Sequence, residues 1–123
     1  MNEALKEDYL SLVDKLQESN RLGGVMGILH WDQEVIMPTG AAESRAQQLG
    51  ALAGVLHEKT THPEMGKLLD RLPRDNENGF TNFEWCNIVE ARREFDMATK
   101  IPKSFVTELA ELSSRAHQVW VQA

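Results

Sequence analysis

Residues 30–40 read His-Trp-Asp-Gln-Glu-Val-Ile-Met-Pro-Thr-Gly, and this stretch marks the main turning point of the chain. An apolar helical segment runs into it, and a polar, alanine-rich segment leaves it. Pro38 pushes Met37 toward an extended conformation. Gly40 suits the cap of the next helix, with Glu43 as its partner three residues on. The stretch therefore predicts a bend between two helices. It is also the first candidate region for catalytic or binding residues.

Apolar spacing predicts helices on both sides of this bend. Two of them, over residues 2–20 and 22–33, precede it. Three glycines close together in the second helix indicate either a break near Gly23 or close packing by another helix. A third helix, over residues 41–59, follows the bend, and its narrow stripe of small apolar side chains favours close packing against a neighbour.

Two helices are predicted in the last third of the chain. Thr81 and Glu84 form a capping box, so one helix begins at about Asn82 and ends before Ile101. Pro102 opens the other helix. Because few residues join these helices, we expect them to be antiparallel neighbours. The apolar stripe expected to pack in the last helix consists of Phe105, Leu109, Leu112, Ala116, Val119 and Trp120.

Between these groups lies a short helix with a loop after it. His62 suits the cap position, because Pro63 at the first helical position needs no backbone N–H. Leucine and methionine recur at helical spacing over residues 64–72. Residues 73–79 hold breakers and charges with no apolar side chain, which is typical of an exposed loop.

The sequence thus predicts an all-α fold of five or six helices, arranged as helical hairpins or a bundle. The loop at 73–79 is the expected boundary between subunits of about 1–72 and 80–123. Residues 119–123 keep a helical pattern without a glycine or a basic last turn. This pattern favours a chain cut inside a helix over a natural helical end that frays.

Composition excludes several classes of function. The net charge of −6 over 123 residues leaves no basic stripe, so nucleic acid is not an expected partner. No apolar run reaches the roughly 18 residues of a membrane span, and the acidic N-terminus does not read as a signal peptide. Cys86 is the only cysteine, which favours a reducing, cytoplasmic compartment and a thiol buried on a helix face.

The segment from His57 to His62 comes closest to a metal motif. Zinc proteases carry two histidines four residues apart, which a helix places within about 40° of each other. His57 and His62 are five residues apart, which separates them by about 140° on a helix. Pro63 also draws His62 out of helical geometry. No metal site is predicted here.

The polar residues of the 30–40 stretch do not complete a catalytic set either. His30 and Glu34 lie one helical turn apart, but a zinc site needs at least three protein ligands. Asp32 and Glu34 point apart, so their expected role is to accept backbone or arginine hydrogen bonds at the turn. Arg92, on an apolar stripe, either belongs to a solvated face or reaches a buried carboxylate. No catalytic, cofactor-binding or metal-binding residue is predicted.

Several stretches, taken in order, resemble the N-terminal region of the thermostable carboxypeptidase Taq family. Residues 29–38 and 40–49 are similar to its tryptophan-aspartate-glutamine element, its methionine-proline turn and a helix rich in alanine, arginine and glutamine. Residues 91–102 resemble a later helix and proline turn, and 114–116 with Trp120 resemble the family's segment after that turn. The motif residues, to which we assign a structural role, are Trp31, Asp32, Gln33 and Pro38.

The resemblance implies a metallocarboxypeptidase that removes residues from peptide C-termini and uses zinc or another divalent metal. It implies a larger, mostly helical fold in which residues 1–123 form an N-terminal wall or lid over a groove. The family's His-Glu-x-x-His helix and downstream glutamate match no position here, so this segment is expected to bind no metal and to be inactive alone. The implied partners are the remainder of the peptidase chain and a peptide substrate, with a homodimer left open.

A free-standing helical interaction module without enzymatic activity is the alternative. Such a module would keep the lid helices and lack the catalytic half of the enzyme. The reading frame after Ala123 discriminates between the two. A fragment of an enzyme should also expose apolar surface and self-associate.

Overall fold

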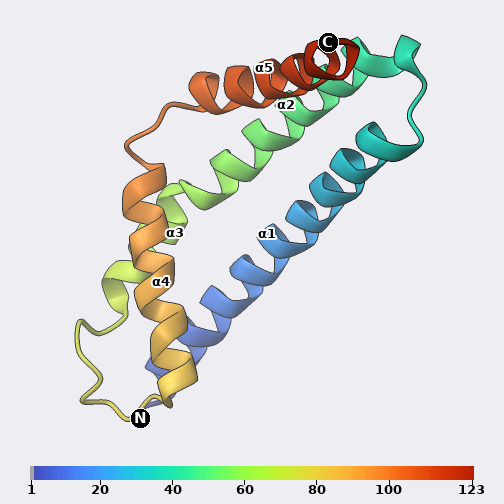
Figure 1. Cartoon of the computed structure of the whole chain (residues 1–123). Helices are drawn as coiled ribbons and strands as arrows, with labels where there is room; N and C mark the ends of the chain where they lie inside the picture. Colours follow the sequence, from blue (N-terminus) through green and yellow to red (C-terminus); the bar gives the residue numbers. More distant parts are fainter. Residues whose placement is uncertain (1) are drawn as a thin grey trace. The chain divides into compact units, whose positions relative to one another are not determined.

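The computed structural model describes residues 2–123, which form helices joined by short connections (Figure 1). No strand occurs among these residues, so the predicted all-α class is confirmed. No helix in this range is both long and apolar enough to cross a membrane. The elements are α1 (Glu3–Val35), the 3-10 helix η1 (Thr39–Ala41), α2 (Ala42–Thr60), α3 (Pro63–Arg71), α4 (Asn82–Ala98) and α5 (Lys103–Gln122).

α1 continues through its glycines as one helix of 33 residues, so the predicted break near Gly23 does not occur. The other interpretation of the glycines, close packing, also fails among the described residues. A Cβ atom added at Gly23, Gly24 or Gly27 would meet nothing within 4 Å. Each glycine costs about 1 kcal/mol relative to alanine. The cooperativity of a long helix outweighs this cost, because every further residue adds a hydrogen bond without a new nucleation step.

The described helices divide into two compact units, each built from segments far apart in the sequence. Unit 1 comprises residues 2–19 and Lys59–Lys100, and unit 2 comprises Asn20–Glu58 and Ile101–Ala123. This division differs from the subunits expected on either side of the loop, because residues 73–79 lie inside unit 1. The reason is helix length, since α1 and α2 are each long enough to contribute to both units.

Unit 1 contains a hydrophobic core built by three helices, α1, α3 and α4, and by residues between α3 and α4. Leu12 of α1, Leu68 of α3 and Ile88 of α4 are fully buried in it. These residues lie on the apolar faces that the helical spacing predicts. The other core members are Met65, Leu69, Leu72, Phe80 and Ala91, with Leu5, Tyr9, Leu16, Trp85 and Phe95 packed against them.

Two predicted helix caps are confirmed in unit 1. The Nδ1 atom of His62 accepts a hydrogen bond from the backbone N–H of Glu64 at 3.1 Å, at the start of α3. The hydroxyl of Thr81 accepts one from the N–H of Glu84 at 3.2 Å, at the start of α4. Each cap satisfies one of the N–H groups that a helix start leaves without a partner.

Arg92 of α4 binds the C-terminal end of α3 and the residues after it. Its Nη2 donates to the carbonyls of Leu69 and Leu72 at 2.8 and 2.7 Å, and its Nη1 donates to the carbonyl of Pro73 at 2.9 Å. Both interpretations from the sequence are wrong here, because the partner is neither solvent nor a carboxylate. The last carbonyls of a helix lack helical donors. Burial lowers the pKa of Arg92, but a guanidinium in a protein stays protonated.

Unit 2 packs α2 against α5 through small residues. Gly50 and Gly54 of α2 are buried, and a Cβ atom at Gly50 would overlap the side chain of Glu111 on α5. The predicted close packing of this helix is therefore confirmed. The other buried residues of α2 are Ala46, Leu49 and Ala53, so unit 2 buries few large side chains.

Ion pairs join the two ends of α2 and α5. Arg115 Nη2 lies 2.7 Å from the Glu43 carboxylate, and Lys103 Nζ lies 2.5 Å from that of Glu58. Since the start of α5 lies beside the end of α2, the two helices are antiparallel (Figure 1). The helices α4 and α5 belong to different units, so their expected antiparallel pairing stays a prediction.

The apolar stripe of α5 faces outward, which corrects the prediction that it packs. Phe105, Leu109 and Leu112 are 51%, 51% and 63% exposed, and Trp120 is 76% exposed. The side that packs is polar instead, and its most buried residue is Ser114. The reason is that polar side chains on this side bind α1 and α2.

Candidate functional site

The stretch at residues 30–40 forms the corner at which α1 ends. The N–H groups of Ile36 and Met37 both donate to the carbonyl of Asp32, at 3.0 and 2.8 Å. Pro38 follows in an extended conformation, with φ −64° and ψ 147°. Gly40 then lies inside the tight turn of η1, so the predicted glycine cap of α2 is wrong.

Asp32 ties this corner to α2 through Arg45. Arg45 Nη2 donates to the Asp32 carboxylate at 2.8 Å, and Nη1 donates to the carbonyl of Leu29 at 2.8 Å. The expected role of Asp32, accepting an arginine hydrogen bond at the turn, is confirmed. Glu34 is exposed. The structure thus does not bring the two acids together as an acid/base pair.

Gln33 ties the same corner to α5. Its Nε2 donates to the Ser114 hydroxyl at 2.8 Å and to the Ser114 carbonyl at 3.1 Å. Gln33 and Ser114 are the two buried polar residues of the described chain, at 8% and 3% exposure. Their separation of 81 residues explains why no local pattern predicts this pair.

Replacing Gln33 with alanine should lower the free energy of unfolding by about 1–3 kcal/mol, because Ser114 is left buried without its donor. Gln17→Ala, at an exposed position of the same helix, is the control and should change it by less than about 0.5 kcal/mol. Urea unfolding followed by circular dichroism measures both. The double variant with Ser114→Ala should show coupling of at least about 0.5 kcal/mol. Strict additivity would contradict a direct bond between the two side chains.

The remaining motif residues lie at the surface of the corner. Trp31 is 55% exposed, and Pro38 is also exposed. His30 is exposed beside them. Within residues 2–123 no group of three histidine, cysteine, aspartate or glutamate side chains is placed to hold a metal ion. The donor set that a zinc site needs is therefore not found in the described part of the chain.

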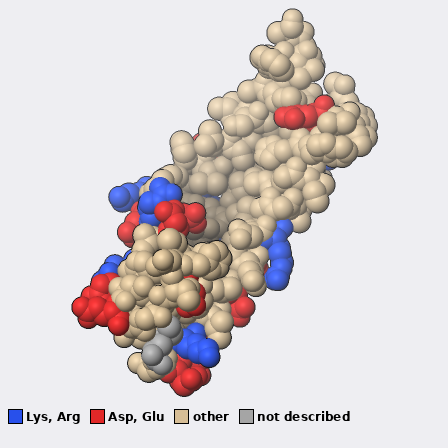
Figure 2. All heavy atoms as spheres, turned by 60° about the horizontal axis from the view of Figure 1, so that its bottom comes forward, with Lys and Arg blue, Asp and Glu red and all other residues tan. Residues whose placement is uncertain are grey.

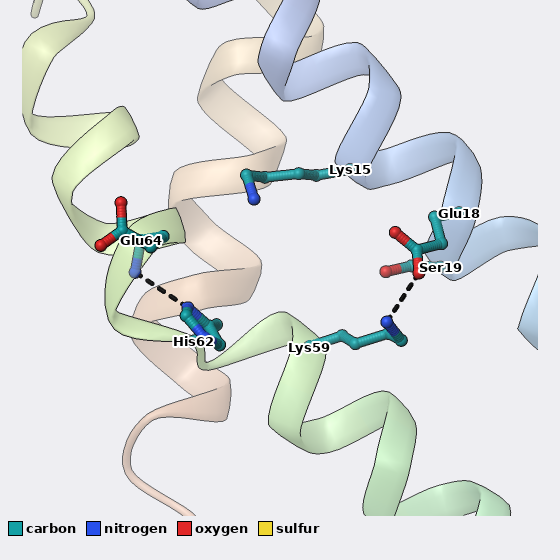
Figure 3. A pocket seen from close by; sticks show the side chains of 6 residues that line it. All are labelled: Lys15, Glu18, Ser19, Lys59, His62 and Glu64. Carbon is teal, nitrogen blue, oxygen red and sulfur yellow. Dashed lines mark hydrogen bonds and ion pairs between the residues drawn. The ribbon is translucent and has the colours of Figure 1, made fainter.

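A small polar cavity of about 150 Å³ lies in unit 1, beside the cap of α3 (Figure 3). Lys59 Nζ forms an ion pair with Glu18 at 2.6 Å across its rim. His62 points its Nδ1 at the N–H of Glu64, as the sequence predicts for a capping histidine. With Lys15 also in the lining, two ammonium groups lie near His62. The carboxylates of Glu18 and Glu64 belong to the same lining, so the formal charges around the cavity balance.

A second hollow, of about 350 Å³, lies in unit 2 beside η1. Its charged groups, Glu43 and Arg115, already bind each other. Hydrogen bonding from the Arg115 guanidinium lowers the pKa of the Glu43 carboxyl. Neither charge is thus available to a ligand without breaking the pair.

Cys86 was expected to be buried on a helix face, but it is exposed. The core face of α4 carries Ile88 and Ala91. Cys86 is two positions from Ile88, and two residues of a helix point about 200° apart. This offset places the thiol on the outer side.

The fold and the corner at residues 30–40 define a class of protein. It is an all-α segment whose motif residues form a structural corner. A model of the carboxypeptidase Taq (M32) metallopeptidase family matches residues 11–123, and the chain belongs to this family. The likeness thus covers nearly the whole chain, as the resemblance of the motifs implies.

The chain is also similar in sequence to three curated carboxypeptidases. The chain is 29% identical over 117 residues to thermostable carboxypeptidase 1 of Thermus thermophilus, which covers 94% of this chain and 23% of the relative. It is 28% identical over 122 residues to thermostable carboxypeptidase 1 of Pyrococcus furiosus, covering 99% and 23%. It is 26% identical over 111 residues to carboxypeptidase 1 of Bacillus subtilis, covering 89% and 22%. No solved structure matches the chain.

Proposed function

We propose that this chain forms the N-terminal helical wall of a metal-dependent carboxypeptidase, beside the groove that binds peptide substrates. The observation that carries the proposal is the family match over residues 11–123. The chain spans about a quarter of the length of the relatives it matches. Release of residues from peptide C-termini would then depend on the remaining part of such an enzyme, and this segment would be inactive alone.

Within that enzyme, the residues Trp31, Asp32, Gln33 and Pro38 would have a structural role. The bonds of Asp32 to Arg45 and of Gln33 to Ser114 support this role, because they join the end of α1 to both other helices of unit 2. The metal would be zinc, held by residues of the remaining part. The described residues offer no donor set that fits it, and we therefore derive no catalytic step from this chain.

The proposed location is the cytoplasm. A lone cysteine, Cys86, suits a reducing compartment, where a thiol needs no disulfide partner.

The test is to extend the reading frame that contains residues 1–123 to its stop codon and to purify the encoded protein. We expect a chain about four times as long, in proportion to the 23% coverage of the relatives, with a His-Glu-x-x-His motif downstream. It should release C-terminal residues from unblocked peptides, lose this activity with a chelator and regain it with zinc. The 123-residue chain should release none.

A stop codon directly after Ala123 would contradict the proposal and favour a free-standing interaction module. A longer product without the His-Glu-x-x-His motif would contradict it as well. An active product that resists chelation would remove the metal from the proposal and leave the peptidase.

A further inference from the structure

Unit 2 exposes most of the large hydrophobic side chains that are exposed in the described chain. Those on α1 and α5 form two stripes, which together we call the apolar surface of unit 2. Because Gln33 and Ser114 face each other, each stripe lies on the side of its helix that is turned away from the other helix. The members of this surface are Val25, Ile28, Trp31, Val35, Phe105, Leu109, Leu112, Val119, Trp120 and Val121.

The α5 part of this surface is one continuous stripe. Phe105, Leu109, Leu112 and Ala116 follow each other at spacings of four, three and four, so they lie on one side of the helix. All four are exposed. An amphipathic helix in a globular protein normally turns its apolar stripe to the core. α5 turns this stripe to the outside, while Ser114 on the other side packs inward.

The α1 part has the same helical spacing. Gly24, Ile28, Trp31 and Val35 lie on one side of α1, again four, three and four residues apart, and all are exposed. The run from residue 22 to 31 contains no lysine, arginine, aspartate or glutamate. Figure 2 shows a wide area without charged side chains on the face that it presents.

Unit 2 has no large core to compensate for this exposure. Its buried side chains on α2 are mainly alanine, with Leu49 as the one large member, whereas the large hydrophobic cluster belongs to unit 1. Soluble monomers rarely expose contiguous apolar patches of more than a few hundred Å². Each of the two stripes thus has the character of a helix face that is normally buried.

We propose that the rest of the peptidase, the part outside the matched segment, covers the apolar surface of unit 2. This inference rests on the proposed function. About three-quarters of each relative lies outside the match, which provides a partner of sufficient size on the same chain. A surface made of large apolar side chains is best covered by an apolar partner, because burial removes its area from water. A partner on the same chain also docks at a high effective concentration.

The test compares Leu109→Lys with a matched control, Leu10→Lys. Both leucines lie inside helices, and they are 51% and 52% exposed. Leu109 belongs to the apolar surface of unit 2, whereas Leu10 lies in unit 1 among charged neighbours such as Lys6 and Asp14. Each substitution is made in the 123-residue chain and in the full-length product of the reading frame.

In the 123-residue chain, both variants should keep the thermal midpoint of the parent, because neither leucine is buried there. In the full-length protein, Leu109→Lys should lower the midpoint by at least about 5 °C, since a lysine would be buried without a partner. Leu10→Lys should leave it unchanged. Sedimentation velocity should show that the 123-residue parent self-associates nonspecifically and that Leu109→Lys reduces this.

Equal midpoints for the two variants of the full-length protein would overturn the inference. So would a discrete dimer of the 123-residue chain that Leu109→Lys dissociates, because the occupant would then be a second copy. Unfolding of the 123-residue chain by Leu109→Lys would also overturn it. Peptidase activity of the unsubstituted full-length protein is read separately, so a failure of the proposed function is distinguished from a failure of the docking surface.

Discussion

Replacing Arg92 with methionine should lower the free energy of unfolding by about 3–5 kcal/mol. The guanidinium donates to three carbonyls, those of Leu69, Leu72 and Pro73. Hydrogen bonds from charged groups contribute about 1.5–3 kcal/mol each, and carbonyls left buried without a donor add a desolvation cost. Methionine keeps much of the length and the apolar stem, so the loss reports the hydrogen bonds more than the packing.

The matched control for this change is Arg93→Met, one residue further along α4. Arg93 is exposed and pairs with Glu90 at 2.9 Å. An exposed pair of this kind contributes about 0–1 kcal/mol. Arg92→Lys should recover little, because one ammonium cannot replace the planar fork that reaches three acceptors. Urea unfolding measures all three variants, and equal effects of Arg92→Met and Arg93→Met would contradict the role of Arg92.

Replacing Leu68 with alanine should lower the free energy of unfolding by about 2–5 kcal/mol. Leu68 is fully buried in the core of unit 1, where α3 meets α1 and α4. The truncation removes buried apolar contacts and leaves a cavity that the surrounding helices fill only in part. Leu68→Met, which keeps most of the volume, should cost less than about 1.5 kcal/mol.

Leu10→Ala is the control for the core substitution, because Leu10 is half exposed on the outer side of α1. Its effect should stay within about 0.5 kcal/mol. Thermal and urea unfolding followed by circular dichroism provide the measurement. A loss at Leu10 as large as that at Leu68 would show that the core of unit 1 is not where the structure places it.

Much of the fold could be predicted from local signals. The caps at His62 and Thr81 depend on a few neighbouring residues, and the structure confirms both. The helices that carry them pack as their periodicity predicts. By contrast, the break predicted at Gly23 is absent, because the local preference of glycine is weaker than the cooperativity of α1.

At the corner of residues 30–40, too, some features could be predicted from the sequence and others could not. The resemblance identified Trp31, Asp32, Gln33 and Pro38 from a short stretch, without placing their partners. Arg45 and Ser114 emerged only from the structure. Ser114 lies 81 residues from Gln33, and a serine in a helix gives no sign of which distant amide it will accept a bond from.

By itself, the sequence determined the helical class, the caps at His62 and Thr81 and the family of this protein, because each is encoded in residue types at short spacing. Only the tertiary structure decided which side of a helix is covered. The stripe of α5 has the periodicity of a core-facing helix, yet it lies outside while Ser114 packs inward. Periodicity records that one side of a helix is apolar, but the atoms that cover that side come from residues distant in sequence.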